Sequence, residues 1–290
     1  MRGFGVHAMM WSSLWDRAGA ERAISGAAAY QQDYIEIPLI DIPSTDARYT
    51  RSLLEEHRLR ATCSLVLPEA AWASIRPDAA IDHLKAALNT AAEMGAEALT
   101  GVTFGGTNER TGMPPTQEEY DNLSRAIGAA AKHAKTLGLQ FGIEAVNRYE
   151  NHLINSAEQA VELVERIGMD NIFVHLDTFH MNMEEKGLAA GIVAAGSHLK
   201  YMHMSESDRG TPGFGNIAWD ELFGALSAIG FHGLLVLESF AALPPAMAGA
   251  TSTWRAPAPS AHDVLDKGIP FLRNKAEQYG LFKESRKTTR

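Results

Sequence analysis

Eight short apolar runs, each rich in branched or aromatic residues, recur along the chain at intervals of about 25 to 40 residues. Stretches rich in Ala, Leu and Glu, with the period of a helix, lie between them. This regular alternation predicts a repeated unit of one strand followed by one helix. The expected strands are Phe4–Met9, Tyr34–Pro38, Ala61–Leu67, Ala98–Phe104, Gln140–Val146, Ile172–Thr178, Leu199–Ser205 and Leu234–Phe240.

The expected helices occupy about 19–30, 46–57, 78–94, 117–137, 156–167, 187–196, 218–229 and 262–279. Gly138, Gly168 and Gly230 follow helical stretches, at positions where a C-cap is expected. Thr116 and the pair Asn155-Ser156 precede other helical stretches, at positions typical of an N-terminus. The capping signals therefore agree with the periodicity.

Eight parallel strands with alternating helices favour a closed (β/α)8 TIM barrel, an α/β fold, although an open doubly wound sheet has the same alternation. A dinucleotide-binding sheet would need a glycine-rich turn after the first strand, where this chain reads MMWSSLWDRAG. No linker divides the sequence, so residues 1–290 are expected to form a single domain. The Pro/Ala-rich stretch 241–260 is expected to be a loop over the site, and 283–290 a solvated tail.

The charge balance excludes some classes of partner. Twenty-six Lys and Arg against 35 Asp and Glu give a net charge of −9, which repels nucleic acid. The N-terminus has no long apolar segment followed by a cleavage site, and the single cysteine, Cys63, allows no intrachain disulfide. We therefore expect a cytoplasmic protein with no nucleic-acid or membrane partner.

Charged or polar side chains interrupt the apolar pattern in four consecutive expected strands. They are Glu144, Asp177, His203 and Glu238, and each falls towards the C-terminal end of its strand. Barrel strands are buried on both faces, so a charge there requires a compensating partner. Any one of these residues alone is as readily explained by a structural hydrogen bond. Their repetition at matching positions favours a common site, because the C-terminal ends of barrel strands form one rim.

Three carboxylates and one imidazole at a common point require a cation. A divalent ion such as Mn²⁺, Mg²⁺ or Co²⁺ suits three oxygen ligands and one nitrogen ligand, whereas zinc sites more often recruit additional His or Cys. The sequence therefore predicts one divalent metal ion per chain, with Mn²⁺ preferred, held by these four residues.

Several longer segments resemble a known family, the ketose 3-epimerases that act on tagatose, psicose (allulose) and L-ribulose, within the xylose isomerase-like barrels. The segments are IEAVNRYE at 143–150, LDTFHMNMEE at 176–185, HMSESDRG at 203–210, WDELFGAL at 219–226 and VLESF at 236–240. The likeness spans nearly the whole chain. It implies that the four residues above are the metal ligands and that Glu144 and Glu238 are also the catalytic acid/base pair.

The same resemblance implies that Glu150, His180 and Arg209 hold substrate oxygens near C1 to C3. Their positions agree, because each follows an expected metal ligand by three to six residues, in a loop at the same rim. A surface ion pair between Glu150 and Arg209, or a helix cap at His180, would be structural alternatives.

Other candidates lie at the edge of the expected site. Trp15 and Phe240, with Trp11, are candidates for an apolar wall against the sugar, although core packing explains them equally well. His7 is a further expected substrate contact, but it departs from the family, as does Gly105-Gly-Thr-Asn-Glu-Arg110, where aromatic residues are frequent. His175 is expected to be a hydrogen-bonded core histidine, and the role of Glu36 is left open.

The resemblance implies C3 epimerisation of a free ketose by deprotonation and reprotonation through a cis-enediolate. An aldose–ketose or sugar-acid isomerase is the main alternative, since an enediol between C1 and C2 needs similar groups. An endonuclease of this fold would want more histidines and a basic surface. A periplasmic sugar-binding protein would usually have a signal sequence and two lobes. The family also implies a homodimer or homotetramer, and the preferred ketose stays open.

Overall fold

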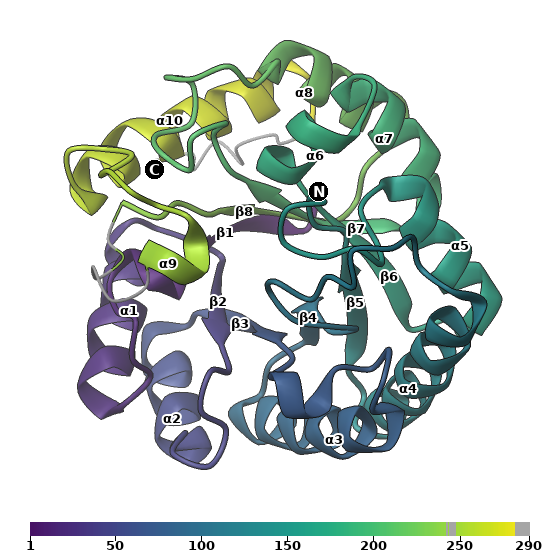
Figure 1. Cartoon of the computed structure of the whole chain (residues 1–290). Coiled ribbons are helices and arrows are strands. Elements are labelled where there is room, and N and C mark those ends of the chain that lie inside the picture. The colour runs from purple at the N-terminus through teal and green to yellow at the C-terminus, as the bar shows by residue number, and fades with distance from the viewer. Residues whose placement is uncertain (242, 244–247, 282–290) are drawn as a thin grey trace.

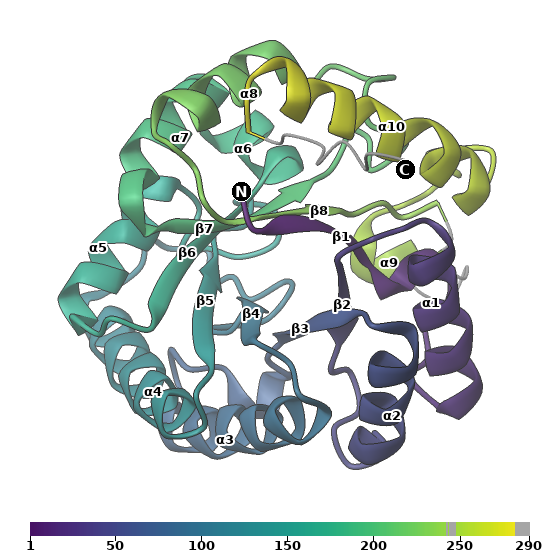
Figure 2. The same ribbon diagram turned by 180° about the vertical axis from the view of Figure 1, so that it is seen from behind.

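The structure, a computed structural model, describes residues 1–241, 243 and 248–281. Eight parallel strands pair in chain order, and the last pairs with the first, so the sheet closes into a barrel. The helices form a ring outside the strands, seen along the barrel in Figure 1 and from the opposite end in Figure 2. The predicted single-domain TIM barrel is confirmed, and the predicted tail 283–290 lies outside the described residues.

All eight predicted strands are present, and each begins within one residue of its predicted start. Their bounds are β1 Gly3–His7, β2 Tyr34–Pro38, β3 Arg60–Val66, β4 Ala98–Val102, β5 Gln140–Glu144, β6 Ile172–Asp177, β7 Leu199–Met204 and β8 Leu234–Leu237. Most end earlier than predicted, because the apolar run continues into the loop after the strand. Phe104 and Val146, for example, are buried beyond the ends of β4 and β5.

The eight predicted helices are also present, and two short helices were not predicted. The bounds are α1 Arg17–Ala29, α2 Ala47–His57, α3 Pro77–Met94, α4 Gln117–Thr136, α5 Ala157–Ile167, α6 Thr178–Glu184, α7 Leu188–Ala195, α8 Trp219–Ala228, α9 Ala248–Thr251 and α10 Ala261–Gln278. The additional helices, α6 and α9, have seven and four residues, too few for a helical period to stand out.

Local hydrogen bonds explain where the main helices begin and end. Thr116 and Ser156 each cap a helix with a complete capping box, in which the side chains of Glu119 and Gln159 bond back to the cap residue. Gly168 ends α5 in the left-handed conformation, with φ 68°. The capping positions expected from the sequence are thus confirmed here.

The inside of the barrel is layered from apolar to polar. The layer nearest the N-terminal ends of the strands is an apolar cluster of Tyr34, Ala98, Phe173, Tyr201, Leu234 and Val236. Two residues further along their strands lie Glu36, Thr100, His175 and His203, all buried. Because side chains alternate between the faces of a strand, this spacing points both layers inward. The polar groups therefore gather towards the C-terminal ends of the strands.

No helix in the described part of the chain has both the length and the apolar character needed to cross a membrane.

Candidate active site

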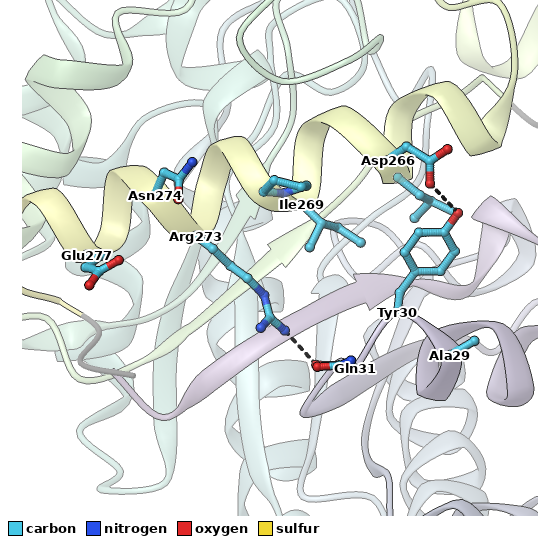
Figure 3. Close-up of a pocket in the computed structure, with 10 residues that line it drawn as sticks. Ala29, Tyr30, Gln31, Asp266, Ile269, Arg273, Asn274 and Glu277 are labelled. Atoms are coloured by element: carbon cyan, nitrogen blue, oxygen red, sulfur yellow. Dashed lines mark hydrogen bonds between the residues drawn. The ribbon is translucent and has the colours of Figure 1, made fainter. Parts of the chain in front are cut away.

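Two cavities lie at different places relative to the barrel, one on its flank and one at the C-terminal ends of the strands. One, of about 480 Å³, lies on the flank between α1 and α10 (Figure 3). Its polar groups already pair across the gap, since Tyr30 donates to Asp266 (2.8 Å) and Arg273 donates to the Gln31 carbonyl (2.6 Å). The other, of about 350 Å³, lies at the C-terminal ends of the strands and has the size of a small-molecule site. This second cavity, the mouth pocket, contains most of the residues expected from the sequence.

The four predicted metal ligands converge at the mouth pocket, where Glu144, His203 and Glu238 line the cavity and Asp177 is fully buried beside them. Glu144 ends β5, Asp177 ends β6, His203 is the penultimate residue of β7, and Glu238 follows β8 directly. The His203 Nδ1 atom lies 3.3 Å from Glu144 Oε1, 3.7 Å from Asp177 Oδ2 and 3.6 Å from Glu238 Oε2. Four elements separated along the sequence thus bring one nitrogen and three carboxylates together.

These distances are close to those expected for ligands of one shared cation. Two ligands bound at about 2.1 to 2.2 Å, at angles of roughly 90° to 110°, lie about 3.0 to 3.6 Å apart. The buried His203 Nδ1 has no hydrogen-bond partner among the described residues, although it faces three carboxylates. A lone pair directed at an ion would account for that, and the donor set matches a hard or borderline divalent metal.

More than one trio of side chains in the described residues has donor atoms close enough for an ion. Asp177, His203 and Glu238 form one such trio, in which each ligand atom lies within 4.8 Å of the others. Two further trios pair Glu144 with His175 and His203, or with Asp177 and His180. The three overlapping trios together include all four predicted ligands, along with His175 and His180.

Glu36, whose role the sequence left open, contacts His203 across the inside of the barrel. Its Oε2 atom accepts hydrogen bonds from His203 Nε2 (2.7 Å) and from the Tyr201 hydroxyl (2.7 Å), and the carboxylate is fully buried. The bond to Nε2 directs Nδ1 towards the three ligand carboxylates. A carboxylate behind a ligating histidine is a common arrangement that fixes the ring and raises its basicity.

The electrostatics of the cluster keep Glu144 and Asp177 ionised. Burial by itself raises the pKa of Glu144, but His175 and His203 outweigh it and hold the pKa below its usual range. For Asp177, burial is likewise outweighed, chiefly by Arg209, so that its pKa is also lowered. Burial lowers the pKa of His203, whereas Glu36 and Glu144 raise it, with a net increase. The cluster thus presents anions to a cation.

His175 lies one layer deeper than Asp177, two residues earlier in β6, as the sequence predicted. Its Nδ1 atom is 3.0 Å from the Thr100 hydroxyl and 3.7 Å from Glu144 Oε2. Burial is the main cause that lowers its pKa to about 4, so the ring is neutral near pH 7. The hydrogen-bonded core histidine expected from the sequence is found here.

Arg209 reaches into the cluster from the loop after β7. Its Nη1 donates to Asp177 Oδ2 (2.8 Å) and contacts Glu238 Oε2, and its guanidinium lies between the rings of Phe179 (4.2 Å) and Phe240 (4.5 Å). The residue has a positive φ of 62°, a conformation uncommon for a non-glycine residue.

Hydrogen bonds within the loop hold that backbone in place. The Arg209 N–H donates to the Glu206 carbonyl, and its own carbonyl accepts from Phe240 N–H and the Ser239 hydroxyl. The fully buried Glu206 carboxylate accepts from four N–H groups of the loop and of Trp219. The loop is therefore organised around the fully hydrogen-bonded Glu206 carboxylate, and its conformation directs Arg209 towards the cluster.

Glu150 and His180 line the same pocket, joined by Asn147. The Asn147 Nδ2 group lies 3.0 Å from Glu150 Oε1 and 2.8 Å from His180 Nδ1, and its backbone N–H also faces that nitrogen at 3.1 Å. Glu150 makes no ion pair with Arg209 among the interactions of the described residues, so that structural alternative finds no support.

The remaining expected contacts divide into two groups. His7 and Phe240 line the mouth pocket, and His7 Nε2 lies 3.5 Å from Glu36 Oε1. Trp15 is not among the residues that line it. The Trp15 ring packs on the core, and its Nε1 donates to Thr50 in α2 (3.1 Å). Trp11 is also absent from the lining, and packs at Gly26 and Tyr30 of the flank instead.

The wall opposite the metal cluster is largely apolar and comes from the ends of β2 to β4. Its side chains include Leu39, Ile40, Leu65, Val66 and Val102. One residue of the predicted covering loop 241–260, Thr251, also lines the pocket.

Sequence reasoning missed some of the residues that organise the site. Asn147 and Glu206 lie in loops without a periodic pattern, so nothing in their spacing indicates a role. Glu36 carried the same signal as the metal ligands, a charge in a buried strand, but its contact with His203 depends on how β2 and β7 face each other across the barrel.

The comparisons with known proteins agree with this architecture. The family described as xylose isomerase-like TIM barrel matches residues 24–274. The L-ribulose 3-epimerase of Methylomonas sp. (strain DH-1) is 34% identical over 94% of this chain and 97% of its own. The ketose 3-epimerase of Arthrobacter globiformis is 33% identical over 87% and 89%.

A solved structure is similar throughout. It is a D-allulose 3-epimerase from Methylomonas sp. in complex with D-allulose, with a TM-score of 0.90, 34% identity, and coverage of 94% of this chain and 97% of that one. Taken with the barrel and the convergent ligand cluster, these matches show that the chain belongs to the ketose 3-epimerase family of xylose isomerase-like TIM barrels.

Proposed function

We propose that this protein is a divalent-metal-dependent ketose 3-epimerase, which inverts C3 of a free ketose such as L-ribulose, D-psicose or D-tagatose. The observation that carries the proposal is the convergence of Glu144 and Glu238, from opposite sides of the rim segment β5 to β8, on a cluster completed by Asp177 and His203. The names of the similar proteins, L-ribulose, ketose and D-allulose 3-epimerases, support the same reaction.

The cluster would hold the metal through Glu144, Asp177, His203 and Glu238, and three oxygen ligands favour Mn²⁺, with Mg²⁺ or Co²⁺ as alternatives. When bound, a divalent ion would polarise the C2 carbonyl of the ketose and acidify the proton on C3.

The two glutamates would carry out the proton transfer. One carboxylate removes the proton from C3, which leaves a planar cis-enediolate, and the other carboxylic acid delivers a proton to the opposite face. The bond to the new proton inverts C3, and no electrons are gained or lost overall. The lowered pKa of Glu144 supports this scheme, because a base must be ionised before it accepts a proton. In the reverse direction the two residues exchange roles.

Glu150, His180 and Arg209 would hold the reacting end of the sugar. The contacts of Arg209 with two aromatic rings and of His180 with Asn147 restrict both side chains, as precise orientation requires. His7, Phe240 and the apolar wall would contact the rest of the chain of carbon atoms. Trp15 is not included, since it lies outside the pocket lining.

The test is a ketose panel assayed with a defined metal content. The purified protein is stripped with a chelator, and Mn²⁺, Mg²⁺ or Co²⁺ is added back before L-ribulose, D-psicose, D-tagatose and D-fructose are supplied. We expect C3 epimers only after metal is restored. Undiminished turnover after exhaustive chelation, or no C3 epimer from any ketose, would contradict the proposal.

Two properties of the whole protein are part of the same proposal. We expect a homodimer or homotetramer, which light scattering after size-exclusion chromatography would measure. We also expect a cytoplasmic location, in keeping with the single, buried and unpaired Cys63.

A further inference from the structure

The amide of Asn147 is held in one orientation by three separate neighbours. Its Oδ1 accepts from the Tyr149 backbone N–H (3.0 Å), and its Nδ2 donates to Glu150 Oε1 (3.0 Å) and to His180 Nδ1 (2.8 Å). If the amide were turned over, its oxygen would face the Glu150 carboxylate and its NH2 would face a backbone donor. The side chain is 2% exposed, so water cannot replace these partners.

This orientation fixes the tautomer of His180. The Asn147 backbone N–H also points at His180 Nδ1, at 3.1 Å, and a backbone N–H can only donate. Two donors directed at Nδ1 require that nitrogen to carry the lone pair. In the neutral ring the proton must then be on Nε2, which faces Arg209 and the mouth pocket.

With the His180 proton on Nε2, the contact between His180 and Arg209 cannot be a hydrogen bond. Arg209 Nη2 lies 3.1 Å from His180 Nε2, but guanidinium nitrogens only donate, and Nε2 has its own proton. A neutral imidazole offers a single acceptor nitrogen, and Asn147 already occupies it. The two N–H groups therefore cannot bond to each other, and both are satisfied only by an acceptor placed between them.

We propose that Asn147 is a positioning residue that holds His180 as an Nε2–H donor, so that His180 and Arg209 form a two-donor cradle for one oxygen of the ketose. The inference rests on the proposed function for the identity of the ligand. The oxygen that suits the cradle is one that gains negative charge as the enediolate forms, because preorganised donors stabilise developing charge most strongly. A neutral imidazole that donates to such an oxygen is a known catalytic device.

The first test reads the tautomer without any turnover. Protein labelled with ¹⁵N-histidine and loaded with Mg²⁺, which is diamagnetic, is examined by long-range ¹H–¹⁵N correlation, and the His180 signals are assigned by their loss in H180A. We expect a protonated Nε2 and an unprotonated Nδ1. In N147D, whose carboxylate faces Nδ1, we expect a proton on Nδ1. N155D changes an asparagine of the same loop that does not contact His180, and should leave the signals unchanged.

A wild-type His180 with its proton on Nδ1 would overturn the proposal, and so would an unchanged Nδ1 in folded N147D. If N147D does not fold, N147A replaces it. That variant keeps the backbone donor, so the Nε2–H form should persist in N147A, with a weakened bond to Nδ1.

The second test asks whether Asn147 acts through His180. For C3 epimerisation we expect N147D to lower kcat by about 10- to 100-fold, with KM changed by less than about threefold, the pattern of a contact stronger in the transition state. In an H180A background the same change should have almost no effect on kcat. An equal loss of kcat in both backgrounds would mean that Asn147 supports the loop alone, and would overturn the proposal.

The two tests also separate this inference from the proposed function. If the protein epimerises no ketose but the tautomer behaves as expected, the proposed substrate fails and the positioning role survives. If epimerisation is found but the tautomer is reversed, only the positioning role fails.

Discussion

Glu144 and Glu238 each have two functions in this account, as metal ligands and as acid or base. Replacing either with Gln keeps the shape but removes the charge and the ability to accept a proton. We expect E144Q and E238Q each to lower the rate of C3 epimerisation by at least about 100-fold, since acid/base groups contribute on the order of 10² to 10⁴. Steady-state kinetics at saturating metal would measure this, and near-normal kcat in either variant would rule out the two-base scheme.

Glu36 affects the metal through His203 without touching the proposed ion. We expect E36Q to weaken metal affinity by about 10- to 100-fold, the usual effect of losing a carboxylate behind a ligating histidine. Isothermal titration with Mn²⁺ measures it directly. E109Q is a matched control, because Glu109 is also a buried glutamate but bonds to Ser74, Gly106 and Asn151 instead. Equal affinities in E36Q and E109Q would refute the role of Glu36.

Sequence alone identified residues whose chemistry conflicts with their surroundings. A charged or polar side chain in a buried strand is unfavourable unless it has a partner. This made four residues stand out: Glu144, Asp177, His203 and Glu238. The family resemblance added Glu150, His180 and Arg209, which all line the pocket or reach the cluster. Trp15 does not line the pocket but packs on the core and donates to Thr50, two environments that an indole fits equally well in sequence.

At the scale of elements, strand β5 has to approach its neighbours closely to present Glu144. A Cβ atom at Gly142 would lie 2.2 Å from Thr100 Oγ1 and about 2.5 Å from the Phe173 ring. We expect G142A to destabilise the fold by about 1 to 3 kcal/mol or more, as overpacking does.

The matched control is G128A in helix α4, where the nearest atom would lie at 3.7 Å, an ordinary contact. Alanine in a helix interior is favoured over glycine by roughly 1 kcal/mol, so G128A should be neutral or stabilising. Urea unfolding of both variants checks the pair, and equal destabilisation would show that the crowding at Gly142 does not matter.

Element types were predictable, but several element boundaries were not. The alternation of apolar runs and helical periods gave every strand and every long helix. The end of β8 is the main error, because Glu238 and Ser239 remain buried after the strand has ended at Leu237. A strand ends where its pairing with the neighbouring strands stops. That pairing depends on contacts between segments distant in the sequence, so the local sequence does not show where it stops.

At the scale of the whole molecule, the proposed metal would link strands from one half of the barrel. A cation bound only by the folded protein stabilises it by about 2.7 kcal/mol when its free concentration is 100 times Kd. At roughly 2 °C per kcal/mol for a large domain, chelation should lower Tm by on the order of 5 °C. Calorimetry with and without chelator measures the shift. An identical Tm in both conditions would argue against a site made from four strands.

The central claim is that the proton removed and returned is the one on C3. The most direct measurement is incubation of the metal-loaded protein with a ketose in heavy water, followed by NMR location of the deuterium. We predict label at C3 of both epimers, and loss of that label in E144Q and E238Q. Label at C1 with none at C3 would identify an aldose–ketose isomerase and contradict the account.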